Sequence, residues 1–105
     1  MVKELEDVEE FNVIMETAGD KLLVIDFTAV WCGPCKRISP VFEALSHEYP
    51  DVLFYKVDVD NARDIAESCG IRAMPTFHFY KNGSKIDEIC GADEAELRKK
   101  VACLK

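Results

Sequence analysis

The chain has 105 residues, of which 49% are hydrophobic and 31% charged, and its formal net charge is −7. This length and composition predict one globular domain over residues 1–105 and exclude a disordered or fibrous chain. The acidic excess argues against nucleic acid or an anionic membrane as partner, because both attract clustered Lys and Arg. No apolar run reaches the length of a membrane span, and the charged N-terminal segment lacks a signal core, so we expect a cytoplasmic protein.

The first third of the chain predicts two strands and a helix. Lys3–Leu5 is expected to be a short opening strand. A helix should follow between Asp7 and Gly19, because Asp7 and Glu10 resemble a capping box and Gly19 suits a helix end. The run Leu22–Val30 is almost continuously apolar, which is typical of a strand buried on both faces.

The middle of the chain predicts a long helix, a strand and a short helix. Pro34 suits the first turn of a helix that continues to Tyr49, with a kink expected at the internal Pro40. The segment "DVLFYKVDVD" is rich in β-formers and predicts a second central strand. Asn61 is expected to cap a short helix that ends at Gly70.

The last third predicts a hairpin and a final helix. Residues 76–90 form two strands joined at Asn82-Gly83, and Ile86 and Ile89 fall on opposite faces, which suggests a bulge. Asp93 begins the last helix. The element order β-α-β-α-β-α-β-β-α predicts an α/β fold with a mostly parallel central sheet, helices over it, and antiparallel strands at one edge.

The segment "AVWCGPCKR" carries the clearest chemical signal. Cys32 falls where the strand meets the helix N-terminus, whose free N–H groups and dipole stabilise a thiolate. Cys35 lies about one turn further in, close enough for a disulfide. Gly33 permits close approach of a substrate backbone and Pro34 stiffens the turn. The pattern suits an attacking Cys32 and a resolving Cys35.

Two other interpretations of this pair remain open but are less favoured. A structural zinc site needs two further ligands, yet there is no second Cys-x-x-Cys, and His47 and His78 are isolated. A turn with incidental thiols is disfavoured because Cys-x-x-Cys at a strand-to-helix junction is itself a redox signal. Five cysteines at uneven spacing are also a poor framework for structural disulfides.

Asp26 interrupts a run that should be buried, where an unpaired carboxylate is costly. Asp26 is a satisfied buried carboxylate, a residue on an exposed face of its strand, or an acid with a raised pKa that exchanges a proton with Cys35. Lys56 in the next strand is a candidate charge partner. Trp31 is interpreted as part of a docking surface in preference to the core. The base rate of X-Pro bonds predicts a trans bond before Pro75.

The other three cysteines are interpreted as structural or surface residues. Cys69 shares the apolar face of its helix and is expected to be packed in the core. Packing is also the favoured interpretation for Cys90, at the end of a strand beside the expected docking loop. Cys103 lies away from the inward face of the last helix. We expect it to be exposed and able to form adventitious disulfide dimers of an otherwise monomeric protein.

Several motifs together resemble the thioredoxin family over essentially the whole chain. They are "WCGPCK" with an Asp six positions before the first cysteine, Pro40, "MPTF" and "KNG", while "VDVD" and "KLLVIDF" resemble the animal cytosolic type. The resemblance implies three α/β/α layers, with a five-stranded mixed sheet and four helices. It also implies that Cys32 attacks a protein disulfide, Cys35 resolves the mixed disulfide, Asp26 relays the proton, and Pro75 is cis.

The resemblance extends to partners and to a docking surface. It implies an NADPH-dependent thioredoxin reductase as the source of electrons, so that no cofactor binds this chain, and disulfide-containing clients such as peroxiredoxins. The docking residues that match are Trp31, Gly33, Pro34, Ala73, Met74, Pro75, Gly91 and Ala92. Ala62 and Ala73 stand where animal relatives often have cysteines, so disulfides at those positions are not carried over. Lys56 looks more like the bacterial pattern.

Three functions follow from these observations, and a protein disulfide reductase is the leading one. The second is a binding module that docks a partner on the same surface, with redox state as a switch. The third, a disulfide-forming oxidase, is disfavoured by the Gly33-Pro34 pair and by the missing signal segment.

Overall fold

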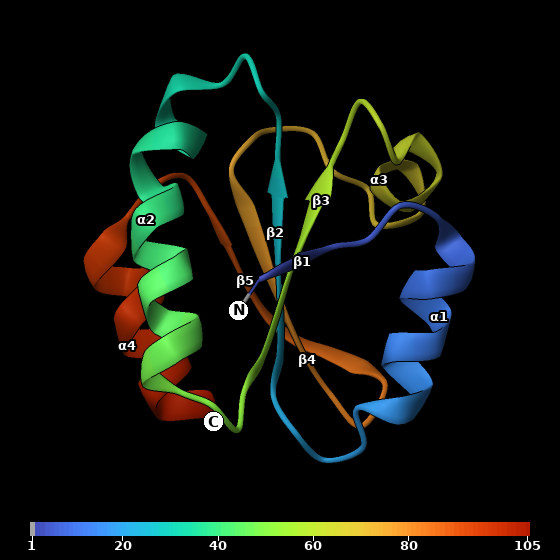
Figure 1. The fold of residues 1–105 in the computed structure, drawn as a ribbon, viewed down its shortest axis with the longest axis vertical. Helices are drawn as coiled ribbons and strands as arrows, with labels where there is room; N and C mark the ends of the chain where they lie inside the picture. The colour runs from blue at the N-terminus through green and yellow to red at the C-terminus, as the bar shows by residue number, and fades with distance from the viewer. Residues whose placement is uncertain (1) are drawn as a thin grey trace.

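The computed structural model describes residues 2–105, which form a five-stranded sheet with four helices (Figure 1). The strands are β1 (Lys3–Glu4), β2 (Leu23–Thr28), β3 (Leu53–Asp58), β4 (Thr76–Lys81) and β5 (Ser84–Cys90). The helices are α1 (Val8–Thr17), α2 (Gly33–Glu48), α3 (Arg63–Ser68) and α4 (Glu94–Leu104). The predicted element order is therefore confirmed.

The sheet has the order β1-β3-β2-β4-β5, and it is mixed. The pairs β1–β3 and β2–β3 are parallel, whereas β4 runs antiparallel to both β2 and β5. Helices α2 and α4 cover one face, and α1 and α3 cover the other (Figure 1). The expected three layers and antiparallel edge are confirmed.

The central strand β2 is buried on both faces, as its apolar run predicts. Because side chains alternate along a strand, Val24 packs into the cluster below α2 and α4, while Ile25 and Phe27 pack into the cluster below α1 and α3. Each fully buried side chain of this size contributes about 1.5–3 kcal/mol to folding. Strand β2 thus joins two hydrophobic cores.

Local signals set most helix starts, with one correction. The carboxylates of Asp7 and Asp93 accept the backbone N–H three residues on, at 2.9 and 3.0 Å, and cap α1 and α4. The prediction that Asn61 caps α3 is wrong. The carboxylate of Asp58 instead accepts the N–H groups of Asp60 and Asn61, and α3 begins after Ala62 without a side-chain cap.

The hairpin between β4 and β5 follows its sequence signal. Asn82 and Gly83 both have positive φ, 52° and 76°, as the tight turn between twisted strands requires. The register shifts between Phe79 and Tyr80, which pair with Asp87 and Lys85, so that Ile86 is the additional residue of a bulge. The expected bulge is confirmed.

We predict that Val101→Ala, in α4, lowers the free energy of unfolding by about 2 kcal/mol, because Val101 is fully buried and its methyl groups leave a cavity. The matched control is Val13→Ala in α1, where the valine is 55% exposed. Both changes gain the same helix propensity. Urea unfolding of the two variants measures the difference; equal stabilities would contradict the packing assigned to α4.

Candidate active site at the start of helix α2

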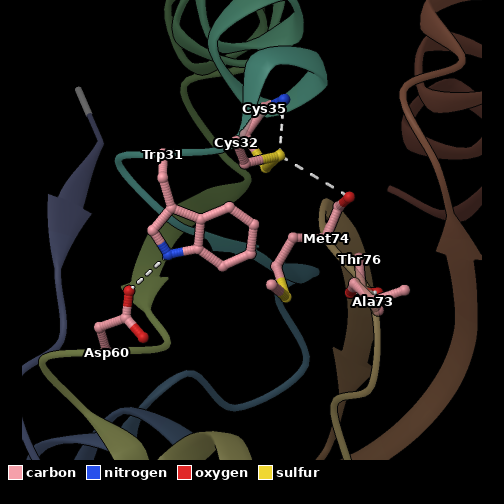
Figure 2. Close-up of a disulfide and its surroundings, with 7 residues drawn as sticks. All are labelled: Trp31, Cys32, Cys35, Asp60, Ala73, Met74 and Thr76. Atoms are coloured by element: carbon pink, nitrogen blue, oxygen red, sulfur yellow. Dashed lines mark hydrogen bonds between the residues drawn. A yellow bond between two sulfur atoms is a disulfide. The ribbon is translucent and has the colours of Figure 1, made fainter.

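The site begins where the chain leaves β2 and enters α2. Cys32 is the N-cap of α2 and forms a disulfide with Cys35, and the two Cα atoms lie 5.3 Å apart. The backbone N–H of Cys35 donates to Cys32 Sγ at 3.2 Å (Figure 2). In the reduced form, this N–H and the helix dipole favour a thiolate on Cys32, which is the requirement for a nucleophile.

Both cysteines are buried, with Cys35 1% and Cys32 5% exposed, whereas the preceding residues Val30 and Trp31 are 70% and 65% exposed. Two large apolar side chains are thus exposed directly before Cys32. Exposed apolar patches of this kind mark surfaces that bind other proteins.

Figure 2 shows the loop that faces Cys32. Cys32 Sγ lies 3.8 Å from the carbonyl oxygen of Met74, and the Met74–Pro75 bond is cis. The trans bond expected from base rates is therefore wrong, and the cis bond implied by the family resemblance is present. The Thr76 hydroxyl donates to the Ala73 carbonyl at 2.7 Å, a local hydrogen bond across the loop.

The second loop at this edge is the segment after β5. The N–H of Gly91 donates to the carbonyl of Pro75 at 2.9 Å, which places Gly91 and Ala92 beside the loop before β4. Gly91 has a φ of 103°, a conformation that strains any side chain. The structure thus brings together residues 73–75 and 91–92, which are distant in the sequence.

Sequence analysis missed a polar partner of Trp31. The indole Nε1–H donates to Asp60 Oδ2 at 2.8 Å, which fixes the ring while its face stays exposed (Figure 2). Asp60 is the last residue of "VDVD", directly after β3, so its position at the end of a parallel strand was the available signal. A fixed ring loses less conformational entropy when a partner binds it.

Asp26 lies beneath the disulfide and is 4% exposed, and its Oδ1 has no hydrogen-bond partner within residues 2–105. It pairs in register with Lys56 of β3. Burial raises the pKa of Asp26 from 3.8 to about 7, although the nearby Lys56 charge lowers it in part. The interpretation as an acid with a raised pKa is thus favoured over a satisfied structural carboxylate.

A cleft of about 300 Å³ connects this acid to the buried cysteine. Both Asp26 and Cys35 line it, together with Lys36, Ser39 and Lys56. Polar side chains and room for solvent provide the conditions under which water bridges two buried groups. The Asp26 carboxyl group and Cys35 thus share one cleft with polar side chains.

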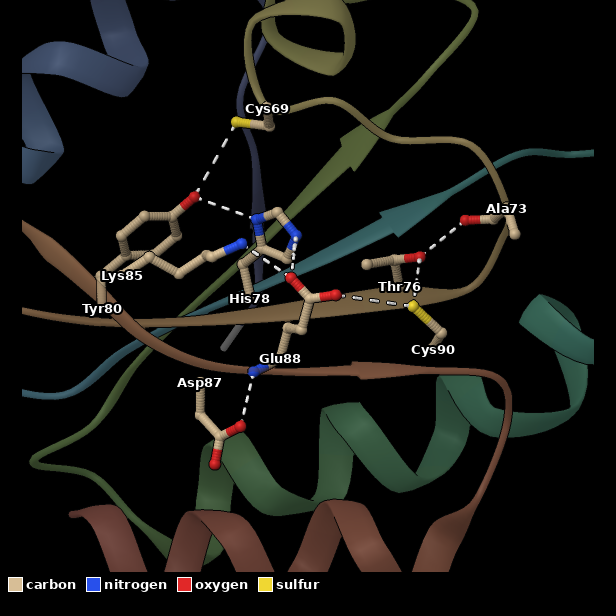
Figure 3. A network of polar contacts seen from close by, with 9 residues as sticks. All are labelled: Cys69, Ala73, Thr76, His78, Tyr80, Lys85, Asp87, Glu88 and Cys90. Carbon is tan, nitrogen blue, oxygen red and sulfur yellow. Dashed lines mark hydrogen bonds and ion pairs between the residues drawn. The ribbon is translucent and has the colours of Figure 1, made fainter.

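A polar network on β4 and β5 is the largest feature that sequence analysis missed (Figure 3). The buried His78 Nδ1 lies 3.1 Å from Tyr80 Oη, which lies 3.8 Å from Cys69 Sγ. On the other side, His78 Nε2 lies 3.7 Å from a carboxylate oxygen of Glu88. Burial, and then the Lys85 charge, lower the pKa of His78, while Glu88 raises it in part.

The three cysteines outside the motif have different surroundings. Cys69 is half-buried and packs against the cluster below α1 and α3, as expected, and burial raises its pKa. Cys103 is exposed, as expected, and its disulfide dimer stays a prediction. The packed position expected for Cys90 is wrong because β5 is an edge strand: Cys90 is exposed, opposite Thr76.

Among residues 2–105 there is no group of three or more His, Cys, Asp or Glu side chains that could hold a metal ion. The same residues contain no helix that is both long and apolar enough to cross a membrane.

Comparisons with known proteins agree with this geometry. The thioredoxin family model matches residues 2–103. Thioredoxin from Ictalurus punctatus is 54% identical over 103 residues, 96% of each chain, and human thioredoxin is 48% identical over 97 residues, 92% of each chain. The crystal structure of Fasciola hepatica thioredoxin is 40% identical, with a TM-score of 0.96 over 98% of this chain and 99% of that one.

Another similar structure comes from yeast. It comes from a study of thiol resolution in a yeast mitochondrial 1-Cys peroxiredoxin by glutathione and thioredoxin systems. Its chain is 42% identical, with a TM-score of 0.91 over 98% of this chain and 95% of that one. The chain described here belongs to the thioredoxin family. It is a thiol-disulfide oxidoreductase with a Cys32–Cys35 redox disulfide.

We predict that Asp26→Asn raises the stability of the oxidised protein at pH 8. The folded-state pKa of Asp26 is raised, so this residue costs no stability below pH 3.8, and the cost grows to its full size near pH 7. The full cost is about 4 kcal/mol. Unfolding of both proteins at pH 8 and at pH 4 measures it. An equal gain at both pH values would assign the effect to packing instead of ionisation.

We predict that His78→Gln reduces the loss of stability in acid. The folded-state pKa of His78 is lowered, so the neutral imidazole contributes its full share of the folding free energy above pH 6.5. This stabilisation is lost as the pH falls from 6.5 through the folded-state pKa. The glutamine amide still reaches toward Tyr80. The control is His47→Gln on the exposed surface of α2. A slope of stability against pH that is unchanged relative to this control would refute the prediction.

Proposed function

We propose that this chain reduces disulfides in client proteins, with Cys32 as the nucleophile. The observation that carries the proposal is the position of Cys32: it caps α2, accepts the N–H of Cys35, and adjoins the exposed apolar residues Val30 and Trp31. A client sulfur that approaches this surface meets Cys32 before the more deeply buried Cys35.

The reaction proceeds in two exchange steps. The Cys32 thiolate attacks one sulfur of the client disulfide, forms a mixed disulfide and releases the other client sulfur as a thiolate, which takes up a proton. Cys35 then loses its proton, and its thiolate attacks Cys32 Sγ. The Cys32–Cys35 disulfide forms and the second client thiolate leaves, so that two electrons pass from the dithiol to the client.

Asp26 is the proposed proton acceptor for Cys35. A carboxyl group with a pKa of about 7 is ionised in part at neutral pH and exchanges protons readily there. The cleft lined by both residues supports a path through solvent. Lys56, next to Asp26 in register, is proposed to tune this pKa.

The proposed docking surface surrounds the disulfide. It consists of Trp31, Gly33, Pro34, Ala73, Met74, Pro75, Gly91 and Ala92. The loops that hold its second half are bonded to one another and lie beside Cys32. An extended client segment is the proposed occupant, because the loop backbone and the exposed Trp31 ring offer a long, open surface.

An NADPH-dependent thioredoxin reductase is the proposed source of electrons, so this chain needs no bound cofactor. We propose clients that include peroxiredoxins, in keeping with the study of a similar yeast chain. A monomeric, single-domain protein of the cytoplasm is proposed, by analogy with the animal thioredoxins it resembles.

The test is NADPH-coupled reduction of insulin with thioredoxin reductase supplied. We predict that Cys32→Ser lowers turnover by on the order of 10³-fold or more, because it removes the nucleophile. Cys35→Ser should accumulate mixed disulfides that thiol reagents release. The control Cys103→Ser should be as active as the parent, because Cys103 is exposed in the last turns of α4.

Two outcomes would count against this function. A folded parent protein with free thiols that gives no turnover would favour the alternative of a redox-switched binding module. Full activity of Cys32→Ser would transfer the role of nucleophile to another thiol.

A further inference from the structure

The surface between β1 and α1 contains a groove with an apolar lining, on the side of the molecule away from α2 (Figure 1). Its volume is about 400 Å³, and its apolar lining comes from Leu5, Val13, Ile14 and Tyr55. Val13 is 55% exposed, although α1 already buries its other apolar face against the core. An exposed aliphatic side chain in a groove is available for contact with another molecule.

The charged residues that line this groove are mostly acidic. Glu4, Asp7, Glu9 and Glu10 line it, against the single cation Lys3. The Asp7 and Glu10 carboxylates accept backbone N–H groups at the start of α1. The side chains of Glu4 and Glu9 make no hydrogen bond or ion pair with any residue from 2 to 105.

The N-terminal segment holds most of the excess acidic charge of the chain. Residues 1–20 hold seven of the twenty carboxylates and one of the thirteen Lys and Arg side chains, so they account for nearly all of the net charge of −7. Acidic groups in the first turn stabilise the helix dipole, which explains Glu9 and Glu10. That explanation does not extend to Glu4, which precedes the helix, or to the exposed Val13.

We propose that this groove binds a basic, amphipathic segment of a partner protein. An aliphatic side chain of the partner packs on Val13, and Lys or Arg side chains lie beside Glu4 and Glu9. Complementary charge favours this occupant, because it speeds encounter and rejects acidic segments. A second copy of the chain fits poorly, since two acidic rims would face each other.

The groove shares no residue with the docking surface around Cys32, which lies at the start of α2. Of its lining residues only Glu4 also lines the cleft of Asp26 and Cys35, where it lies opposite Lys56 in the sheet. A partner in the groove therefore leaves the disulfide accessible. Such a partner would hold the oxidoreductase near its clients and would not compete with them, which goes beyond the disulfide reduction proposed above.

The experiment titrates the ¹⁵N-labelled full chain with a short amphipathic peptide of lysine and leucine at low ionic strength. We expect chemical-shift changes at residues 3–14 and at Tyr55, and none around Cys32. A peptide of glutamate and leucine, and one of lysine and serine, should each bind much more weakly, because the groove needs both the positive charges and the aliphatic side chains.

Matched variants distinguish binding in the groove from unspecific attraction to an acidic protein. Glu4→Gln with Glu9→Gln should weaken binding by about fivefold, as expected for two exposed charge pairs. Glu16→Gln with Asp20→Asn removes the same charge from residues outside the groove and should change binding less than about twofold. Val13→Ala, which favours the helix, should weaken binding by about threefold or more.

The outcomes that would overturn the proposal are distinct from failure of the reductase. Equal weakening by the two charge-removing pairs, or shift changes spread over the whole surface, would show unspecific attraction to an acidic protein. Peptide-free dimers in sedimentation experiments that Val13→Ala abolishes would assign the groove to a second copy. Insulin reduction should be the same for Val13→Ala and for Glu16→Gln with Asp20→Asn, whichever result the titration gives, because none of these residues lines the cleft of Asp26 and Cys35.

Discussion

The rest of the structure depends on the burial of β2 on both faces. Its side chains alternate between two hydrophobic clusters, and each cluster requires its own pair of helices. The chain leaves this central strand and enters α2 within a few residues, with Cys32 as the N-cap. A fully buried strand therefore leads directly to the redox cysteines, and the loop before β4 lies beside Cys32, bonded to the segment after β5.

The same burial explains the chemistry of Asp26. A carboxyl group in a buried strand prefers the neutral form, and the charge of the neighbouring Lys56 offsets this preference in part. The resulting pKa, about 7, destabilises the fold at alkaline pH and suits proton exchange at neutral pH. Stability is thus reduced at the position where the proposed mechanism needs a proton acceptor, as is common in active sites.

Sequence signals predicted the elements well where the signal was local. Asp7 and Asp93 cap their helices, Asn82-Gly83 forms the hairpin turn, and the apolar run of β2 is buried. The errors arose where neighbouring interactions override a simple pattern. Asp58 accepts the N–H groups of Asp60 and Asn61 in the loop, and α3 begins after Ala62 instead of at Asn61. The edge position of β5 leaves Cys90 exposed.

The sequence by itself determined the element order, the redox cysteine pair and the unusual acid in a buried strand, because spacing and hydrophobic pattern report local structure directly. Only the tertiary structure decided the Trp31–Asp60 contact, the Gly91–Pro75 hydrogen bond and the approach of Glu88 to the buried His78. These contacts depend on which strands and loops become neighbours. They join residues from different parts of the chain, and no local pattern encodes them.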